Sequence, residues 1–152
     1  MRTRGLSIVG PSGLDNTNGF GRPGHVATAW MMVENLGNAY ETTTSIDWTA
    51  PSWGGNPTLH ENSGTEIFSL NLAPGEQKEL FVNLNTPSSL QFGSVTTTTM
   101  TMCIGSGDST LCEDLSVNLT ASAVTIEQTH KRTLPNTTLQ GSVEGSGPVD
   151  GV

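Results

Sequence analysis

The sequence predicts an all-β protein, an antiparallel β-sandwich of about seven strands, and three observations support this prediction. Short runs in which apolar and polar residues alternate recur along the chain, separated by clusters of Gly, Pro and Asn. β-Branched residues dominate one run, SVTTTTMTMCI at residues 94–104, which has no sensible helical interpretation. No window has the apolar spacing of an amphipathic helix.

The first strands follow from this alternation. Residues 4–9 predict a short strand, and residues 10–24 are expected to form a Gly- and Asn-rich loop. Residues 25–35 predict a longer strand that is apolar on both faces, with Trp30 and Met32 on the face opposite its alanines. Such a strand is expected at the centre of a sheet, or beneath a covering neighbour.

The next alternating run places Tyr40, Ile46 and Trp48 on one face, which we expect to be buried. Residues 50–64 are expected to be irregular, with Trp53 packed on the core from this loop.

Residues 70–87, LNLAPGEQKELFVNLNTP, predict two antiparallel strands joined by a tight turn. Pro74 has the φ that the second position of a type II turn needs, and Gly75 supplies the positive φ that must follow. Pro87 ends the second strand, because proline cannot donate to a ladder.

Residues 94–104 and 113–123 predict the last two strands, and the alternation fades from Val124 onward. The remainder is rich in Gly, Ser, Thr and Pro, as in flexible linkers. We therefore predict one domain at residues 1–123 and a linker or tail at residues 124–152, as expected for a module of a larger protein.

Charge narrows the classes of partner. Six Lys and Arg against 14 Asp and Glu give a formal net charge of −8. Nucleic acids and anionic membrane surfaces are therefore disfavoured, because both require clustered basic residues. No apolar run approaches the roughly 18 residues of a membrane-spanning helix, so we expect no membrane insertion.

The two cysteines are expected to pair. Cys103 and Cys112 flank IGSGDSTL, a turn-like segment between two predicted strands, which places them across one hairpin. We predict a disulfide, and the alternative is two reduced thiols on neighbouring strands. A disulfide favours an oxidising compartment, so we expect an extracellular or cell-surface protein.

The order of these motifs resembles the prokaryotic immunoglobulin-like repeats of the NEW3 and CARDB type, found in archaeal and bacterial surface and secreted proteins. The likeness is carried by VENLGN at residues 33–38, LNLAPGE at residues 70–76, a strand closed by Pro87, and Gly93 before a Thr-rich strand. It covers roughly residues 5–123 and implies an immunoglobulin-like β-sandwich with spacer, adhesive or enzyme-appended roles. It implies no catalytic residues.

The candidate chemistry is sparse. His25, His60 and His130 fall at a strand start, in a loop and in the tail, and no Gly-x-Ser-x-Gly motif accompanies them. We predict that the protein is not an enzyme and has no cofactor. The DNTNG segment at residues 15–19 lacks the ligand spacing of a calcium loop, so we predict no metal site. Calcium bound by acidic loops is the alternative.

Two features of the sequence are compatible with a glycan, either as a bound partner or as a covalent modification. If Trp48 and Trp53 were exposed on one face, they could stack on sugar rings, although we favour a core role for both. Asn118 and Asn136 begin sequences with the form of N-glycosylation sites.

We therefore expect a non-catalytic spacer or interaction (adhesion) module, whose partners are neighbouring domains of the same or another surface protein. The alternatives are a carbohydrate-binding or enzyme-appended accessory module, with a glycan as partner, and a filament or particle subunit assembled through sheet edges.

Overall fold

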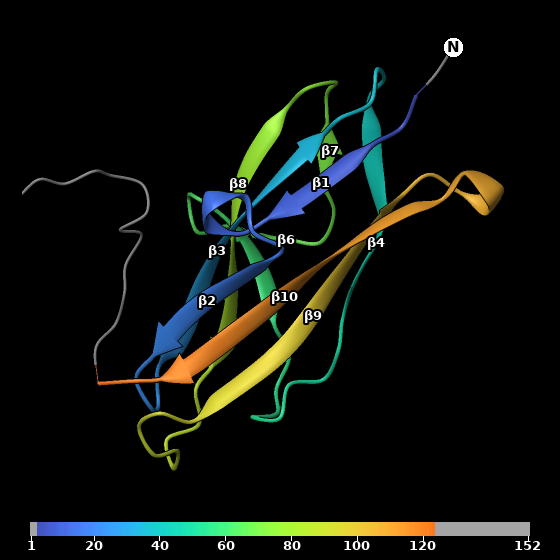
Figure 1. The fold of residues 1–152 in the computed structure, drawn as a ribbon. Coiled ribbons are helices and arrows are strands. Elements are labelled where there is room, and N and C mark those ends of the chain that lie inside the picture. The colour runs from blue at the N-terminus through green and yellow to red at the C-terminus, as the bar shows by residue number, and fades with distance from the viewer. Residues whose placement is uncertain (1–2, 124–152) are drawn as a thin grey trace, which may run out of the picture.

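A computed structural model describes residues 3–123 (Figure 1), and the predicted tail at residues 124–152 lies outside the described residues. The described chain forms ten strands and two short 3₁₀ turns, η1 and η2, which confirms the predicted all-β immunoglobulin-like class with more strands than expected. In chain order the elements are β1 (Leu6–Val9), η1 (Pro11–Gly13), β2 (Asn16–Gly21), β3 (Val26–Asn35), β4 (Glu41–Trp48), β5 (Thr58–Glu61), β6 (Glu66–Ile67), β7 (Asn71–Leu72), β8 (Gln77–Asn85), β9 (Val95–Ile104), η2 (Gly107–Ser109) and β10 (Leu111–Ala121).

The strands form two packed sheets. One sheet has the order β6-β5-β8-β3-β1, and the other has the order β2-β10-β9-β4-β7. The hydrogen-bonded order continues from one sheet to the other through β3 and β2, which share one ladder pair, Phe20 with Thr28, and the bond of the Thr17 hydroxyl to the Trp30 carbonyl. In Figure 1, β9 and β10 cross in front of β3 and β8, so the molecule is a sandwich whose strands run mostly along its long axis.

The core lies between the sheets and is built by alternating residues. On β3 the buried members are Ala27, Ala29, Met31 and Val33, whereas Trp30 and Met32 lie on the opposite, partly exposed face. This confirms that β3 is a central strand, since β8 flanks it on one side and β1 and β2 on the other. The rest of the core comes from the other strands of both sheets and from Leu70 just before β7: Leu6, Ile8, Leu59, Leu70, Leu72, Leu80, Val82, Leu84, Met100, Met102, Ile104, Leu115, Val117 and Leu119.

The expected loop at residues 10–24 contains a strand, which corrects that prediction. After η1 the chain enters β2, which leaves the sheet of β1 and pairs in parallel with β10 over six residue pairs. The inward positions of β2 are Thr17, Gly19 and Gly21, all buried. This strand packs by close backbone approach, so it has no hydrophobic alternation to reveal it.

The expected irregular stretch at residues 50–64 also holds a strand, β5, which pairs with β8. Trp53 packs against the core from the preceding loop, as predicted. Its backbone N–H and that of Ser52 both donate to the hydroxyl of Thr96, at 3.4 and 2.8 Å, which ties the loop to β9.

A bulge in β4 changes which residues face the core. Pairing with β9 shifts in register between Thr43 and Ser45. Glu41 and Thr43 are buried before the shift, and Ile46 and Trp48 pack on the core after it. An extra residue in a strand reverses its face, so Tyr40, predicted to share the face of Trp48, is 67% exposed.

The Pro74–Gly75 turn forms as predicted, but the strands around it do not pair with each other. Gly75 has a φ of 77°, and the N–H of Glu76 bonds the carbonyl of Ala73 at 3.0 Å. β7 pairs with β4, whereas β8 pairs with β3 and β5. The turn therefore carries the chain between the two sheets, which corrects the predicted hairpin.

Asn35 closes the sandwich at this end. Its side chain is fully buried, and its Nδ2 donates to the carbonyls of Ala39 and Leu72 at 2.9 and 3.0 Å. Its Oδ1 accepts from the N–H of Gly37 at 2.8 Å. One amide thereby holds the turn after β3 against β7, satisfying backbone groups that would otherwise be buried without partners.

Candidate functional site

The predicted disulfide is present at the tip of the β9–β10 hairpin. Cys103 and Cys112 are direct cross-strand partners, their Cα atoms are 4.1 Å apart and their sulfurs are bonded. The bridge closes a loop of sequence separation 9 that contains η2. Cys112 is exposed and Cys103 is buried, so the bridge joins the surface of the hairpin to its packed side.

Arg4 holds this hairpin against the start of β4. Its Nη1 donates to the carbonyl of Ser109 at 2.8 Å, and its Nε donates to the carboxylate of Glu41 at 2.8 Å. A hollow of about 620 Å³ opens beside the arginine, lined otherwise by residues 108–111. The guanidinium is committed to internal partners, and the adjacent Asp108 offers a charge of the same sign as an anionic ligand.

The two candidate stacking residues lie on different elements. Trp48 is on β4 and Trp53 is in the following loop, and both are half-buried against the core. A cleft of about 120 Å³ between β4, β5 and β6 is lined by Trp48, Ile67 and Phe68 but not by Trp53. That volume is well below the roughly 300 Å³ of small ligand pockets. A stacking role for the pair stays a prediction.

Phe68 is the residue at this cleft that the sequence pattern missed. Phe68 lies between β6 and β7 and is 80% exposed. A large apolar side chain exposed beside half-buried Trp48 gives this side of the sandwich an apolar rim.

The edge of β4 is open next to this rim. On one side β4 pairs with β9, and on the other β7 covers Glu41 and Thr42. In residues 3–123 no strand continues that cover along Ser45–Trp48. The N–H of Thr49 bonds the carbonyl of Thr99 at 3.0 Å. Because successive residues of a strand point their backbone groups to opposite sides, Ile46 and Trp48 direct theirs to the open edge.

His60 and His25 both make hydrogen bonds within the fold. The ring of His60 bonds the Thr58 hydroxyl at 2.7 Å and the carbonyl of Gly64 at 3.1 Å, which braces the β5–β6 turn. His25 is exposed at the turn before β3, and its carbonyl accepts from Thr86 N–H. His130 lies outside the described residues.

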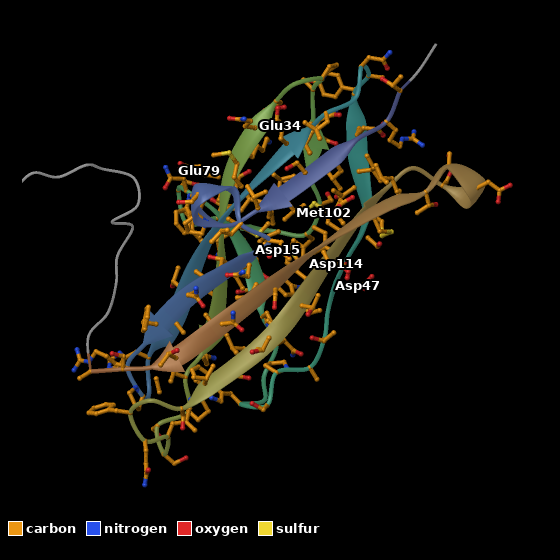
Figure 2. The ribbon with its side chains drawn as sticks, viewed as in Figure 1. Asp15, Glu34, Asp47, Glu79, Met102 and Asp114 are labelled. Atoms are coloured by element: carbon orange, nitrogen blue, oxygen red, sulfur yellow. A yellow bond between two sulfur atoms is a disulfide. The ribbon has the colours of Figure 1, made fainter. Side chains whose placement is uncertain are left out.

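The segment at residues 15–19 runs into β2 and does not form a loop. Acidic side chains are spread over both outer faces of the sandwich: Figure 2 shows Asp47 and Asp114 on one sheet, and Glu34 and Glu79 on the other. Within residues 3–123 no three His, Cys, Asp or Glu side chains gather into a group that could hold a metal ion.

Of the two predicted glycosylation sites, Asn118 lies within the described residues. Asn118 lies on β10, partly exposed, with its Oδ1 accepting from the Thr97 hydroxyl at 2.8 Å. Asn136 lies outside the described residues, and modification of both stays a prediction. No helix of the described chain is long and apolar enough to cross a membrane.

No protein-family model matches the sequence, and no curated protein matches it either. Solved structures match in fold. A PapD-like (ASH) domain of human CEP192 has a TM-score of 0.53 at 11% identity, over 80% of this chain and 87% of that one. A family 123 glycoside hydrolase from Clostridium perfringens has a TM-score of 0.57 at 9% identity, over 81% of this chain.

This chain spans 28% of the length of the hydrolase. A CARDB domain from Pyrococcus furiosus, determined in complex with di-metal ions, matches with a TM-score of 0.37 at 17% identity, over 78% of this chain and 88% of that domain. At these identities the likenesses to the CEP192 domain and the hydrolase show the fold alone, an immunoglobulin-like β-sandwich.

Proposed function

We propose that the chain is a non-catalytic extracellular module that serves as a spacer or interaction domain of a larger cell-surface or secreted protein. Its partners are neighbouring domains of the same or another surface protein. The observation that carries the proposal is the placement of the two ends of the described chain.

The two ends lie at opposite ends of one strand, β3. At the first end, Leu6 pairs with Asn35, and the carbonyl of Thr3 accepts from Asn38 N–H. At the other end, Ser122 N–H bonds the carbonyl of Gly21, and Phe20 pairs with Thr28. A ten-residue strand is about 30 Å long, so the chain enters and leaves along the long axis (Figure 1).

This placement suits a unit joined end to end with others. Both ends are anchored, the first by the ion pair of Arg4 with Glu41 and the last by the parallel ladder of β2 with β10. The order of turns and strands that resembles NEW3 and CARDB repeats supports the same role, and we include that assignment in the proposal.

Small-angle X-ray scattering of two complete chains joined head to tail tests the spacer role, with the single chain as the control. We expect the maximum dimension to grow by about one module length, roughly 30 Å or more. Two copies that pack side by side, with little growth of that dimension, would contradict the proposal.

The Cys103–Cys112 bridge supports an extracellular or cell-surface location, because such bonds persist in oxidising compartments. Intact-mass measurement of protein from its native cells, alkylated with and without prior reduction, tests this location. We expect both cysteines to be alkylated only when the protein has first been reduced. Immediate reaction of both would argue against export.

A second candidate, a filament or particle subunit assembled through sheet edges, is favoured by the open edge of β4 and its apolar rim. Sedimentation at increasing concentration tests it. Assembly by strand addition would be abolished by Ile46→Pro, which removes the edge N–H, and retained by Ile46→Ala, which keeps it. Identical behaviour of the two variants would exclude this edge.

The accessory-module alternative, with a glycan as partner, was predicted on Trp48 and Trp53. Because Phe68, and not Trp53, lies beside Trp48 at the cleft, the test uses Phe68. Titration with oligosaccharides, followed by tryptophan fluorescence in the native chain and in Phe68→Ala, tests it. Saturable quenching in the native chain that Phe68→Ala abolishes would favour a glycan site at this cleft, and unchanged fluorescence would exclude one.

A further inference from the structure

We propose that the module bears tension between its two ends, and that the parallel ladder of β2 with β10 is the element that resists it. This inference rests on the proposed spacer role, because tension requires neighbours on both sides. The ladder resists a pull along the strands more strongly than a pull that opens it from one end.

The ladder lies on the path of the force. β10 is the last described strand, so a pull on the following chain acts first on Ala121. A pull on the preceding chain acts on β1 and then, through η1, on β2. The force at Asn16 and the force at Ala121 therefore point in opposite directions along two strands that lie side by side.

The register makes this a shear geometry. β2 and β10 pair in parallel through six successive pairs, from Asn16 with Ser116 to Gly21 with Ala121. The hydrogen bonds of a ladder run across the strands, so a force along the strands loads all of them together. An opening from one end would instead break them one after another, which requires less force.

The inner side of the ladder is shielded from water. Thr17, Val117, Leu119 and Ala121 are fully buried. The Thr17 hydroxyl donates to the carbonyl of Trp30 at 2.6 Å, which fastens β2 to the opposite sheet. Water can compete for these bonds only from the outer face, which slows rupture.

The connection at the N-terminal end of the force path is shorter, and the ten-pair ladder of β10 with β9 does not join the two pulled strands directly. β1 pairs with β3 through four pairs, and Arg4 adds its bonds to Glu41 and Ser109. The six-pair ladder is therefore expected to set the main barrier to forced unfolding, a kinetic quantity that differs from the equilibrium free energy.

Single-molecule pulling on the complete chain tests the proposal by comparing two directions in one protein. The first pull acts between the N- and C-terminus. The second acts between the C-terminus and a thiol handle at Phe92→Cys, in the exposed loop at the same end of the sandwich as Ala121. This second pull opens β10 from its end. We expect a severalfold higher rupture force in the first direction, and equal forces would overturn the proposal.

Two variants separate mechanical from equilibrium stability. Ser116→Pro removes an N–H that bonds the carbonyl of Asp15 at the start of the ladder, and should lower the end-to-end rupture force. Leu59→Ala removes a core side chain on β5, outside the force path, and should lower the free energy of unfolding in urea with little change in rupture force. The reverse pattern would overturn the proposal.

The disulfide provides a length marker for the unfolding of a single molecule in the pulling experiment. It withholds the segment between Cys103 and Cys112, of sequence separation 9, from extension, so reduction should lengthen the unfolded chain by roughly 30 Å. The scattering experiment remains independent. If the end-to-end force is high but tandem copies pack side by side, the role of the β2–β10 ladder stands and the spacer role fails. If tandem copies are extended but the two pulling directions give equal forces, the spacer role stands and the ladder proposal fails.

Discussion

The Nε of Arg4 donates a 2.8 Å hydrogen bond to Oε2 of Glu41, whose side chain is 3% exposed. The same guanidinium bonds the carbonyl of Ser109 in the disulfide hairpin. Three segments that are distant in sequence therefore meet at one side chain at the first end of the sandwich. This ion pair is largely buried.

Arg4→Ala should destabilise the fold strongly. It removes a cation that is bonded to the buried Glu41 carboxylate, and breaking a buried pair costs about 3–5 kcal/mol, which the 19% exposure of Arg4 reduces to about 2–4. Urea unfolding measures the loss. The double variant Arg4→Met/Glu41→Leu removes both charges and should be closer to the native chain than Arg4→Ala. If Arg4→Ala unfolds at the same urea concentration as the native chain, the Arg4–Glu41 ion pair does not stabilise the fold.

The disulfide should contribute about 2–3 kcal/mol, because a closed loop of this size removes that much chain entropy from the unfolded state. Replacing both cysteines with serine should lower the midpoint of urea unfolding by the corresponding amount. The native chain with reductant should then coincide with the double variant. A native chain whose midpoint does not respond to reductant would contradict this expectation.

Asn35→Ala should cost about 2–4 kcal/mol, since it leaves the carbonyls of Ala39 and Leu72 and the N–H of Gly37 without their partner. Thermal and urea unfolding both report the loss. Asn56→Ala is the matched control, because Asn56 is exposed in a loop and should change stability by less than about 0.5 kcal/mol. Equal effects of the two substitutions would show that the buried amide is not an organising contact.

The strands that sequence could predict are those whose buried faces carry large side chains. β3 and β10 were predicted nearly to their ends because apolar residues recur at every second position, and β9 because β-branched residues dominate it. The Cys103–Cys112 bridge was predictable for a related reason, since its partners are close in sequence across a turn.

Pairing between distant segments was not predictable. The chemistry of Pro74 and Gly75 specifies a turn but not the sheet that each flanking strand joins, so β7 and β8 were wrongly paired. The bulge between Thr43 and Ser45 has no local signal that would reveal the change of face. Arg4 and Glu41 are 37 residues apart, with nothing in either neighbourhood to indicate the contact.

β2 was missed because glycine, rather than a large apolar residue, fills its inward positions, and this explanation can be tested at Gly19. A Cβ at Gly19 would lie 2.2 Å from the Thr28 carbonyl oxygen and 2.8 Å from a methyl of Leu119. The first contact is with backbone, so β2 and β3 would have to separate. Gly19→Ala should therefore cost about 1–3 kcal/mol, as overpacking of a buried site does.

Asn18→Ala is the control for Gly19→Ala, because Asn18 is exposed on the same strand and should be nearly neutral. Urea unfolding compares the two variants, and hydrogen exchange locates the change. We expect faster exchange at Ser116 and Ser122, whose N–H groups bond Asp15 and Gly21 on the β2 segment. Unchanged exchange there would mean that β2 tolerates a methyl group at Gly19, and close backbone packing would no longer explain why a strand forms without apolar alternation.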